Sequence, residues 1–280
     1  MKVKVWGARG SLPDAGPELV RYGGNTSCVE VLGSDGTRLV LDAGTGTRRL
    51  GVSIADTCER LDILLTHFHM DHIQGLGFFA PMFNPDAEVR IWGPPSTTMS
   101  VHQRLTRYLS PPLFPVRLRD FDCKLTLEDA PRGALTIGGL TVEADLVCHP
   151  NPTLGYRITE GNSSVVYLSD HEVALGCPDF PYSAEWTSGF DLARGADLLI
   201  HDTQYNDDEY VEHVGWGHSS LSQSVAFAVL VGAKRLMTFH HDPAHNDTEL
   251  DRLVEEGRKL AEGRLEVIGG TEGATFDVAA

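Results

Sequence analysis

The chain has 280 residues, of which 41% are hydrophobic, and a formal net charge of −16 at pH 7. This length and apolar content allow one large α/β domain or two small ones with a sizeable core. The acidic balance argues against broad, sequence-independent binding of nucleic acid, although a local basic pocket for one phosphate remains compatible with it.

Cysteine usage and hydropathy indicate the cellular compartment. The five cysteines are odd in number and form no C-x-x-C motif, a pattern typical of reduced thiols in a cytosolic protein. Residues 1–7 predict a strand and not a signal peptide, and no apolar run approaches membrane-spanning length. We therefore expect a cytoplasmic protein without a membrane segment.

The first part of the chain alternates between predicted strands and helices. Strands are predicted at Lys2–Trp6, Cys28–Leu32, Arg38–Leu41, Leu61–Leu65 and Glu88–Trp92. Helices are predicted over Asp71–Met82 and from Pro94 to about Leu109. This alternation indicates βα units and a sheet covered by helices. The Pro-rich stretch that follows carries Arg117 and Arg119, which either lie on a surface connection or reach a substrate phosphate.

The second part is richer in strands. They are predicted at Lys124–Leu127, Leu135–Ile137, Leu140–Val147, Thr153–Ile158, Ser164–Leu168, Asp197–Ile200, Lys234–Phe239, Leu265–Ile268 and Ala274–Val278. Helices are predicted at Leu221–Val231 and from Asn246 to about Glu262, where Asn246 and Glu249 form a capping-box pattern. Residues 172–195 are irregular and rich in aromatic residues. The pattern predicts a second sheet.

One short stretch contains three imidazoles and a carboxylate, at His67, His69, Asp71 and His72. It follows the apolar run Leu61–Leu65. His67 and His69 share a face if the strand continues, and a helix that begins near Asp71 turns the other two side chains back towards them. The alternative is a set of ordinary surface or core residues, but four such groups are costly to bury without a cation. The pattern therefore predicts two neighbouring metal sites for Zn, Fe or Mn.

This stretch resembles the His-x-His-x-Asp-His signature of the metallo-β-lactamase-fold hydrolases, which it matches at every defined position. The resemblance implies an α/β protein with an αββα sandwich, two mixed β-sheets flanked by helices, in a single domain over residues 1–280. It also implies later ligands at strand ends, where the sequence offers His149, Asp170 and His240. We prefer His240 to His241 because it directly follows the apolar strand Arg235–Phe239.

By the same resemblance, one metal ion would be bound by His67, His69 and His149. The other would be bound by Asp71, His72 and His240, and Asp170 would bridge the two ions. The implied cofactor is a pair of divalent metal ions, with Zn first and Mn or Fe as alternatives. Asp170 replaces the Cys of the best-known β-lactamase subclass, and His69 replaces the Glu of the flavodiiron branch. Both differences favour hydrolysis by a metal-bridging hydroxide.

Two later motifs resemble those of the ribonuclease Z-like phosphodiesterases, namely residues 201–203 and residues 217–220. The resemblance implies that Asp202 orients His218, which would neutralise the phosphate and protonate the leaving oxygen. Asp71, Asp202 and His218 are therefore the expected catalytic residues. The alternative is that Ser219 or Ser220 only caps a helix and His218 is solvated. The Gly-rich turns near the N-terminus also resemble this branch, so Arg9, Asn25 and Ser219 are expected to contact substrate.

The expected function is hydrolysis of a small phosphodiester, such as a cyclic nucleotide or cyclic phosphate. The alternatives are an RNA 3′-processing endonuclease of the ribonuclease Z type, a thioesterase or lactonase on the same metal centre, and a non-catalytic metal-dependent binding protein. Extended nucleic acid is disfavoured as a partner by the net charge. Similar proteins are commonly homodimers, and residues 172–195 either cover the substrate, stack a base or form a dimer contact.

Overall fold

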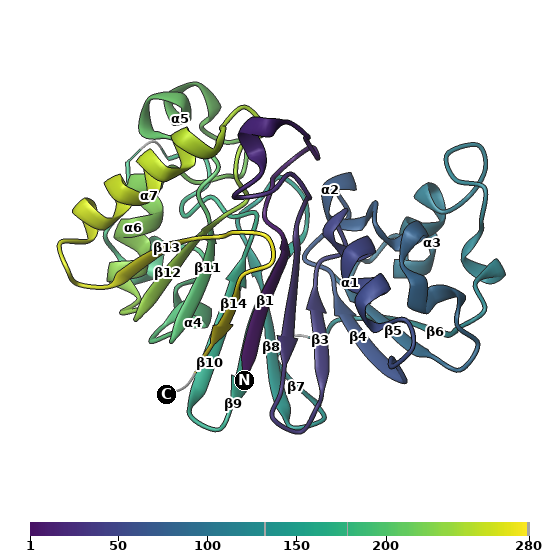
Figure 1. Ribbon diagram of the computed structural model, residues 1–280. Helices are drawn as coiled ribbons and strands as arrows, with labels where there is room; N and C mark the ends of the chain where they lie inside the picture. The colour runs from purple at the N-terminus through teal and green to yellow at the C-terminus, as the bar shows by residue number, and fades with distance from the viewer. Residues whose placement is uncertain (132, 178, 279–280) are drawn as a thin grey trace.

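The strands form two seven-stranded sheets in the computed structural model, which describes residues 1–131, 133–177 and 179–278 (Figure 1). The first sheet contains, in spatial order, β14 (Thr275–Asp277), β1 (Lys2–Gly7), β2 (Cys28–Leu32), β3 (Arg38–Leu41), β4 (Arg60–Leu64), β5 (Glu88–Gly93) and β6 (Lys124–Asp129). The second contains β13 (Glu266–Gly269), β12 (Arg235–Phe239), β11 (Leu198–Asp202), β10 (Ser163–Leu168), β9 (Thr153–Glu160), β8 (Leu140–Val147) and β7 (Gly133–Ile137).

Both sheets are mixed, and each has an antiparallel and a parallel part. Strands β14, β1, β2 and β3 pair antiparallel, whereas β3, β4, β5 and β6 pair parallel. In the second sheet β7 to β10 pair antiparallel and β10 to β13 pair parallel. The carboxyl ends of parallel strands lie at one edge of a sheet, which is where α/β proteins bind ligands.

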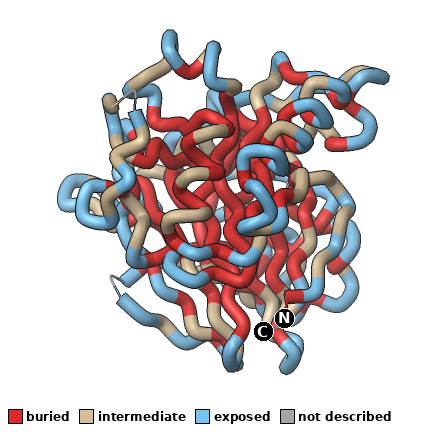
Figure 2. Tube along the Cα trace, turned by 90° about the vertical axis from the view of Figure 1, so that its left-hand side faces the viewer, coloured by how far each residue is buried: buried red, intermediate tan, exposed pale blue. Residues whose placement is uncertain are grey.

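The main core lies between the two sheets. Side chains alternate along β10, so Val165 and Tyr167 face the other sheet while Val166 and Leu168 face the outer helices. Figure 2 shows this arrangement as buried chain through the middle of the molecule and exposed chain around its periphery. β1 and β14 pair side by side, so the two ends of the described chain are adjacent.

Helices cover the outer faces of both sheets, as Figure 1 shows. The α-helices in the described residues are α1 (Gly46–Ile54), α2 (Met70–Ile73), α3 (Val101–Tyr108), α4 (Phe190–Ala193), α5 (Asp207–His213), α6 (Leu221–Leu230) and α7 (Asp247–Ala261). Leu50 and Leu105 pack α1 and α3 on the first sheet, and Val225 and Leu253 pack α6 and α7 on the second. This arrangement confirms the expected αββα sandwich. None of the helices in the described ranges is long and apolar enough to span a membrane.

The predicted helix over Asp71–Met82 is wrong. The structure has the single turn α2, followed by two short 3₁₀ segments at Leu76–Phe78 and Ala80–Phe83. Gly75 explains the interruption, because a Cβ atom there would lie 2.0 Å from the Gly44 carbonyl oxygen. The chain turns where it packs against the loop after β3, and a continuous helix would not permit that approach.

Four other helices differ from the sequence prediction. The helix predicted from Pro94 begins later, at Val101, and its N-cap residue Ser100 forms a capping box with Gln103. Helix α1 was not predicted, because its two glycines lower helix propensity. Gly51 is nevertheless required there, since a Cβ atom would lie 2.7 Å from Phe79. Helices α4 and α5 were also not predicted, and Pro178 of the segment 172–195 lies outside the described residues.

The neighbouring residues Phe78 and Phe79 offer a matched test of this packing. Phe79 is fully buried under α1, whereas Phe78 is 61% exposed. We expect Phe79→Ala to lower the free energy of unfolding by about 3–5 kcal/mol, because it leaves a cavity in the core. Phe78→Ala should lower it by no more than about 1 kcal/mol. Urea unfolding of both variants measures the difference, and equal losses would contradict the packing described.

Candidate metal centre

The ends of four strands bring the expected metal ligands together. Residues 67–72 follow β4, and His149, Asp170 and His240 follow β8, β10 and β12. The side chains form two groups, within each of which the candidate ligand atoms lie within 4.8 Å of one another. The first group contains His67, His69, His149 and Asp170, and the second contains Asp71, His72, Asp170 and His240. Asp170 belongs to both groups.

The distances within the two groups fit metal coordination. Asp170 Oδ1 lies 3.0 Å from His72 Nε2 and 3.3 Å from His240 Nε2. Asp170 Oδ2 lies 3.6 Å from His67 Nε2 and 3.8 Å from His149 Nε2. Ligand atoms that share a tetrahedral metal at about 2.1 Å lie about 3.4 Å apart. One carboxylate oxygen therefore faces each group at the separation expected for a bridging ligand.

Buried ligand atoms without hydrogen bonds support the same interpretation. His67 Nε2, His72 Nε2 and Asp170 Oδ1 are buried and have no hydrogen-bond partner among the described residues. A buried polar atom without a partner is destabilising. A divalent cation in each group would satisfy these atoms, so the donor set fits the pair of metal ions expected from the sequence.

The electrostatics of the centre keep its carboxylates ionised. Burial acts to raise the pKa of Asp170, but the neighbouring His240 and His72 imidazoles hold that pKa well below its usual range. Burial also acts to raise the pKa of Asp71, and the contacts with His72 and His240 lower it. Burial lowers the pKa of His67 well below its ordinary value, so this ring is neutral. Burial acts to lower the pKa of His72 and of His240, but Asp170 and Asp71 raise both, that of His240 to about 9. Ionised carboxylates and neutral imidazoles are the forms that bind metal ions, so a metal ion would displace protons from these two rings.

Each of three candidate ligand imidazoles is oriented by a hydrogen bond through its Nδ1–H. The pairs are His72 with Asp42 Oδ2 at 2.8 Å, His149 with the Gly217 carbonyl at 2.9 Å, and His240 with Gln204 Oε1 at 2.9 Å. In each case the acceptor fixes the tautomer and leaves Nε2 free to bind a metal ion.

Asp42 is a site residue that the sequence analysis did not identify. It is fully buried, and besides His72 it accepts hydrogen bonds from Thr66 N at 2.7 Å and from the Tyr167 hydroxyl at 3.0 Å. Its φ of 59° lies in the left-handed region, which is unfavourable for a residue other than glycine. The signal in the sequence was a carboxylate directly after an apolar strand, the same signal that identified Asp170.

The expected pair of His218 and Asp202 is present beside the second ligand group. His218 Nδ1 lies 2.7 Å from Asp202 Oδ2, and the His218 ring stacks on His240 at 4.9 Å with an interplanar angle of 14°. Asp202 is fully buried and also accepts a hydrogen bond from Gln204 N. Ser220 caps the amino-terminal end of α6, as the alternative interpretation expected, but His218 is paired with Asp202 as well.

The three expected substrate contacts have other partners. Arg9 is only 1% exposed, and its guanidinium donates three hydrogen bonds to backbone carbonyls of neighbouring loops. Asn25 donates to the carboxylate of Glu272, and Ser219 Oγ donates to the His171 carbonyl at 2.6 Å. These hydrogen bonds hold loops around the site, and contact of the three residues with substrate stays a prediction. A sequence reveals such polar residues but not the direction of their side chains.

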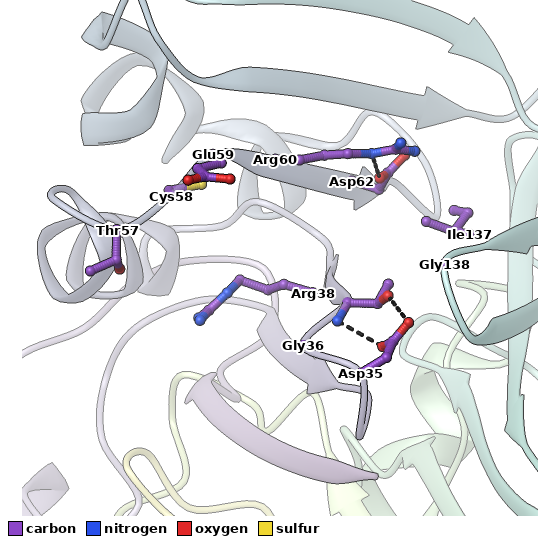
Figure 3. Close-up of a pocket in the computed structure, with 11 residues that line it drawn as sticks. Asp35, Gly36, Arg38, Thr57, Cys58, Glu59, Arg60, Asp62, Ile137 and Gly138 are labelled. Carbon is purple, nitrogen blue, oxygen red and sulfur yellow. Dashed lines mark hydrogen bonds and ion pairs between the residues drawn. The ribbon is translucent and has the colours of Figure 1, made fainter.

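A hollow of about 370 Å³ lies at the amino-terminal ends of β3 and β4, and Figure 3 shows the residues that line it. Its lining includes Arg38 and Arg60, which begin β3 and β4, and Asp62, which pairs with Arg60 at 3.3 Å. The candidate ligands at residues 67–72 follow the opposite, carboxyl end of β4. This hollow is therefore not part of the candidate metal centre.

Comparisons with known proteins agree with this fold and site. The family described as "Beta-lactamase superfamily domain" matches residues 37–241, so the chain belongs to the beta-lactamase superfamily. More closely, the chain is a metallo-β-lactamase-fold hydrolase related to ribonuclease Z. It is 25% identical over 270 residues to ribonuclease Z of Myxococcus xanthus, covering 82% of this chain and 85% of the relative.

Solved structures share the fold over nearly the whole chain. The metallo-beta-lactamase fold protein YhfI from Bacillus subtilis has a TM-score of 0.71 and 21% identity, covering 98% of each chain. Human tRNase Z, short form, has a TM-score of 0.68 and 20% identity, covering 100% of each chain. A diphosphatase from the PhnP family has a TM-score of 0.68 and 19% identity, covering 99% of this chain and 97% of its own.

The hydrogen bond between Asp42 and His72 predicts an effect on metal affinity. We expect Asp42→Asn to weaken binding of zinc by about 10- to 100-fold, because the amide is a weaker acceptor and no longer carries the compensating charge. Competition with a chromophoric chelator measures this affinity. Asp35→Asn, in the remote hollow, is the control and should bind zinc as the wild type does. Unchanged affinity in Asp42→Asn would contradict the orienting role.

His241 predicts a pH dependence of stability. Its ring donates to the Gly270 carbonyl at 2.9 Å, and burial lowers its pKa from 6.5 to about 3. Neutral His241 therefore contributes stability above about pH 6.5, and this contribution falls by about 1.4 kcal/mol per pH unit as the pH decreases towards 3. We expect His241→Gln to be less stable at neutral pH but to lose less stability on acidification. Urea unfolding of the chelator-treated proteins tests this, and parallel profiles would contradict it.

Proposed function

We propose that the protein is a dinuclear metal-dependent phosphodiesterase that hydrolyses a small phosphodiester. The observation that carries this proposal is the buried pair of His218 and Asp202 beside the second ligand group. The seven candidate ligands alone would equally suit thioester or lactone hydrolysis. A histidine oriented by a carboxylate is useful where an anionic phosphate must be neutralised and an alkoxide leaving group must be protonated.

The residues of the centre have different roles in the proposed reaction. Divalent cations held by the two ligand groups would supply Lewis acidity and would lower the pKa of a water molecule at the site. Asp202 fixes the His218 ring through Nδ1, so that Nε2 is free to donate a proton. Asp71 is held in place by the Ser11 backbone N–H, which donates to its Oδ2 at 2.8 Å.

The overall reaction is balanced by one water molecule. Water attacks phosphorus and one P–O ester bond breaks, which leaves a phosphomonoester and an alcohol. His218 donates a proton to the leaving oxygen, and the proton released by the attacking water restores the histidine over the cycle. No redox partner or further cosubstrate is needed.

A small substrate fits the charge of the protein better than a long RNA. The net charge of −16 opposes association with a polyanion, whereas a small diester needs only a local site. RNA 3′-processing is the second candidate, because curated relatives are named ribonuclease Z. Turnover of a precursor RNA in preference to small diesters would favour this second candidate.

His218→Ala, with His102→Ala as a control on the exposed face of α3, tests the proposed function. The assay is hydrolysis of 2′,3′-cyclic AMP, whose leaving group is an alkoxide, by enzyme loaded in turn with Zn, Mn and Fe. We expect His218→Ala and Asp202→Asn to lower kcat by about 10²- to 10⁴-fold, because the acid or its orientation is lost. His102→Ala should retain wild-type activity, and metal content should be unchanged in all three variants.

Two results would contradict the proposal. Absence of turnover with every metal would exclude a phosphodiesterase acting on this substrate class, and thioesters and lactones would then be tested. Wild-type kcat in His218→Ala would exclude the assigned acid and would favour a thioesterase or lactonase on the same centre. Tight metal binding without any turnover would indicate a binding protein.

A further inference from the structure

A pocket with a volume of about 490 Å³ opens directly beside the first ligand group. His67 and His69 form part of its lining, and α3 forms another part. In Figure 1, α3 lies on the outer side of α2, over β5 and β6. The volume is within the range of roughly 300–1,000 Å³ that is typical of small-molecule sites. A substrate bound at the metal centre can therefore extend into it.

One wall of this pocket is aromatic and is held in place by specific contacts. The guanidinium of Arg104 stacks over the Phe68 ring at 4.2 Å, and its Nη2 donates to the Pro94 carbonyl. Gly93 permits this packing, because a Cβ atom there would lie 2.8 Å from Phe68. The Tyr108 hydroxyl donates to the Gln74 carbonyl at 2.7 Å, which fixes the second ring. The wall is thus formed before a ligand binds, which reduces the entropy lost on binding.

The same face of α3 presents a positive charge to the pocket. Arg104, Arg107 and Tyr108 are spaced by three and four residues, so their side chains lie on one side of the helix. Arg104 lies 3.8 Å from Asp129, but within the described part of the chain no carboxylate lies within ion-pair distance of Arg107. Arg107 is exposed and lines the pocket. In a protein with 39 acidic and 23 basic residues, this cation is available to an anionic ligand.

The arginines singled out from the Pro-rich stretch do not have this position. Arg117 and Arg119 are both exposed on the segment after α3, and neither belongs to the lining of the pocket. Arg119 lies 3.7 Å from Asp120. The pocket therefore distinguishes Arg107 from other arginines nearby in the sequence.

We propose that this pocket binds a nucleoside with a second phosphate, so that the substrate is a short nucleotide diester carrying an additional terminal phosphate. The base packs against Phe68 and Tyr108, and Arg107 binds the phosphate that is not hydrolysed. Aromatic rings stack with any base, and a planar guanidinium binds phosphate through paired hydrogen bonds. This inference rests on the proposed function for its scissile diester, but the pocket itself can be tested separately.

The kinetic test compares three substrates with one variant and one control. The substrates are the 3′,5′-linked dinucleotide of two adenosines with a 5′-phosphate, the same dinucleotide without the 5′-phosphate, and bis(p-nitrophenyl) phosphate. We expect Arg107→Ala to raise KM about 10-fold for the phosphorylated dinucleotide, with kcat nearly unchanged, because one charge-assisted contact is lost. The other two substrates should be unaffected. Arg119→Ala, an equally exposed arginine outside the pocket, should resemble the wild type with all three.

The outcomes separate this inference from the proposed function. An unchanged KM in Arg107→Ala, or the same loss with all three substrates, would overturn the pocket assignment even if the diesters are hydrolysed. If no diester is hydrolysed, binding of adenosine 3′,5′-bisphosphate by calorimetry still tests the pocket. Binding about 10-fold weaker in Arg107→Ala than in Arg119→Ala would support it, and equal binding would overturn it.

Discussion

The site depends on Asp170, whose carboxylate contacts both groups of imidazoles. Its two oxygens face different groups of imidazoles, Oδ1 towards His72 and His240 and Oδ2 towards His67 and His149. So many ionisable side chains can be buried together only when their charges compensate one another or are compensated by cations. A carboxylate that serves both groups requires β10 to end between the ends of β4, β8 and β12. The αββα sandwich provides this arrangement, because these strands direct their carboxyl ends to one edge.

The loops around the site also hold the candidate ligands in position. Glu172 is fully buried, and its carboxylate accepts hydrogen bonds from Gly215 N at 2.8 Å and Gly217 N at 2.9 Å. Gly217 in turn accepts the Nδ1–H of His149, so a residue two positions after Asp170 orients a ligand from another strand. His218 follows directly in the same loop. The position of the expected acid is therefore coupled to the geometry of the metal ligands, as is usual for residues around metal sites.

The sequence predicted the parts of the structure that depend on local pattern. Alternating apolar residues located the strands. The motif at 67–72, with the resemblance it carries, located candidate metal ligands, and the structure brings these residues together. The prediction of a helix over Asp71–Met82 was wrong because Gly75 packs closely against Gly44, and no local sequence pattern reveals this contact. Asp42 was missed, and the loop contacts of Arg9 were not foreseen, for a related reason. The direction of a buried polar side chain depends on tertiary packing, and so does the pocket beside α3.

The central claim is that Asp170 bridges two metal ions between the two ligand groups. Anomalous diffraction at the zinc edge, on crystals grown with zinc, tests this most directly. The account predicts two anomalous peaks about 3.5–4 Å apart, one beside each oxygen of Asp170, each with its own histidine ligands. A single peak, or two peaks of which one lies away from Asp170, would contradict it.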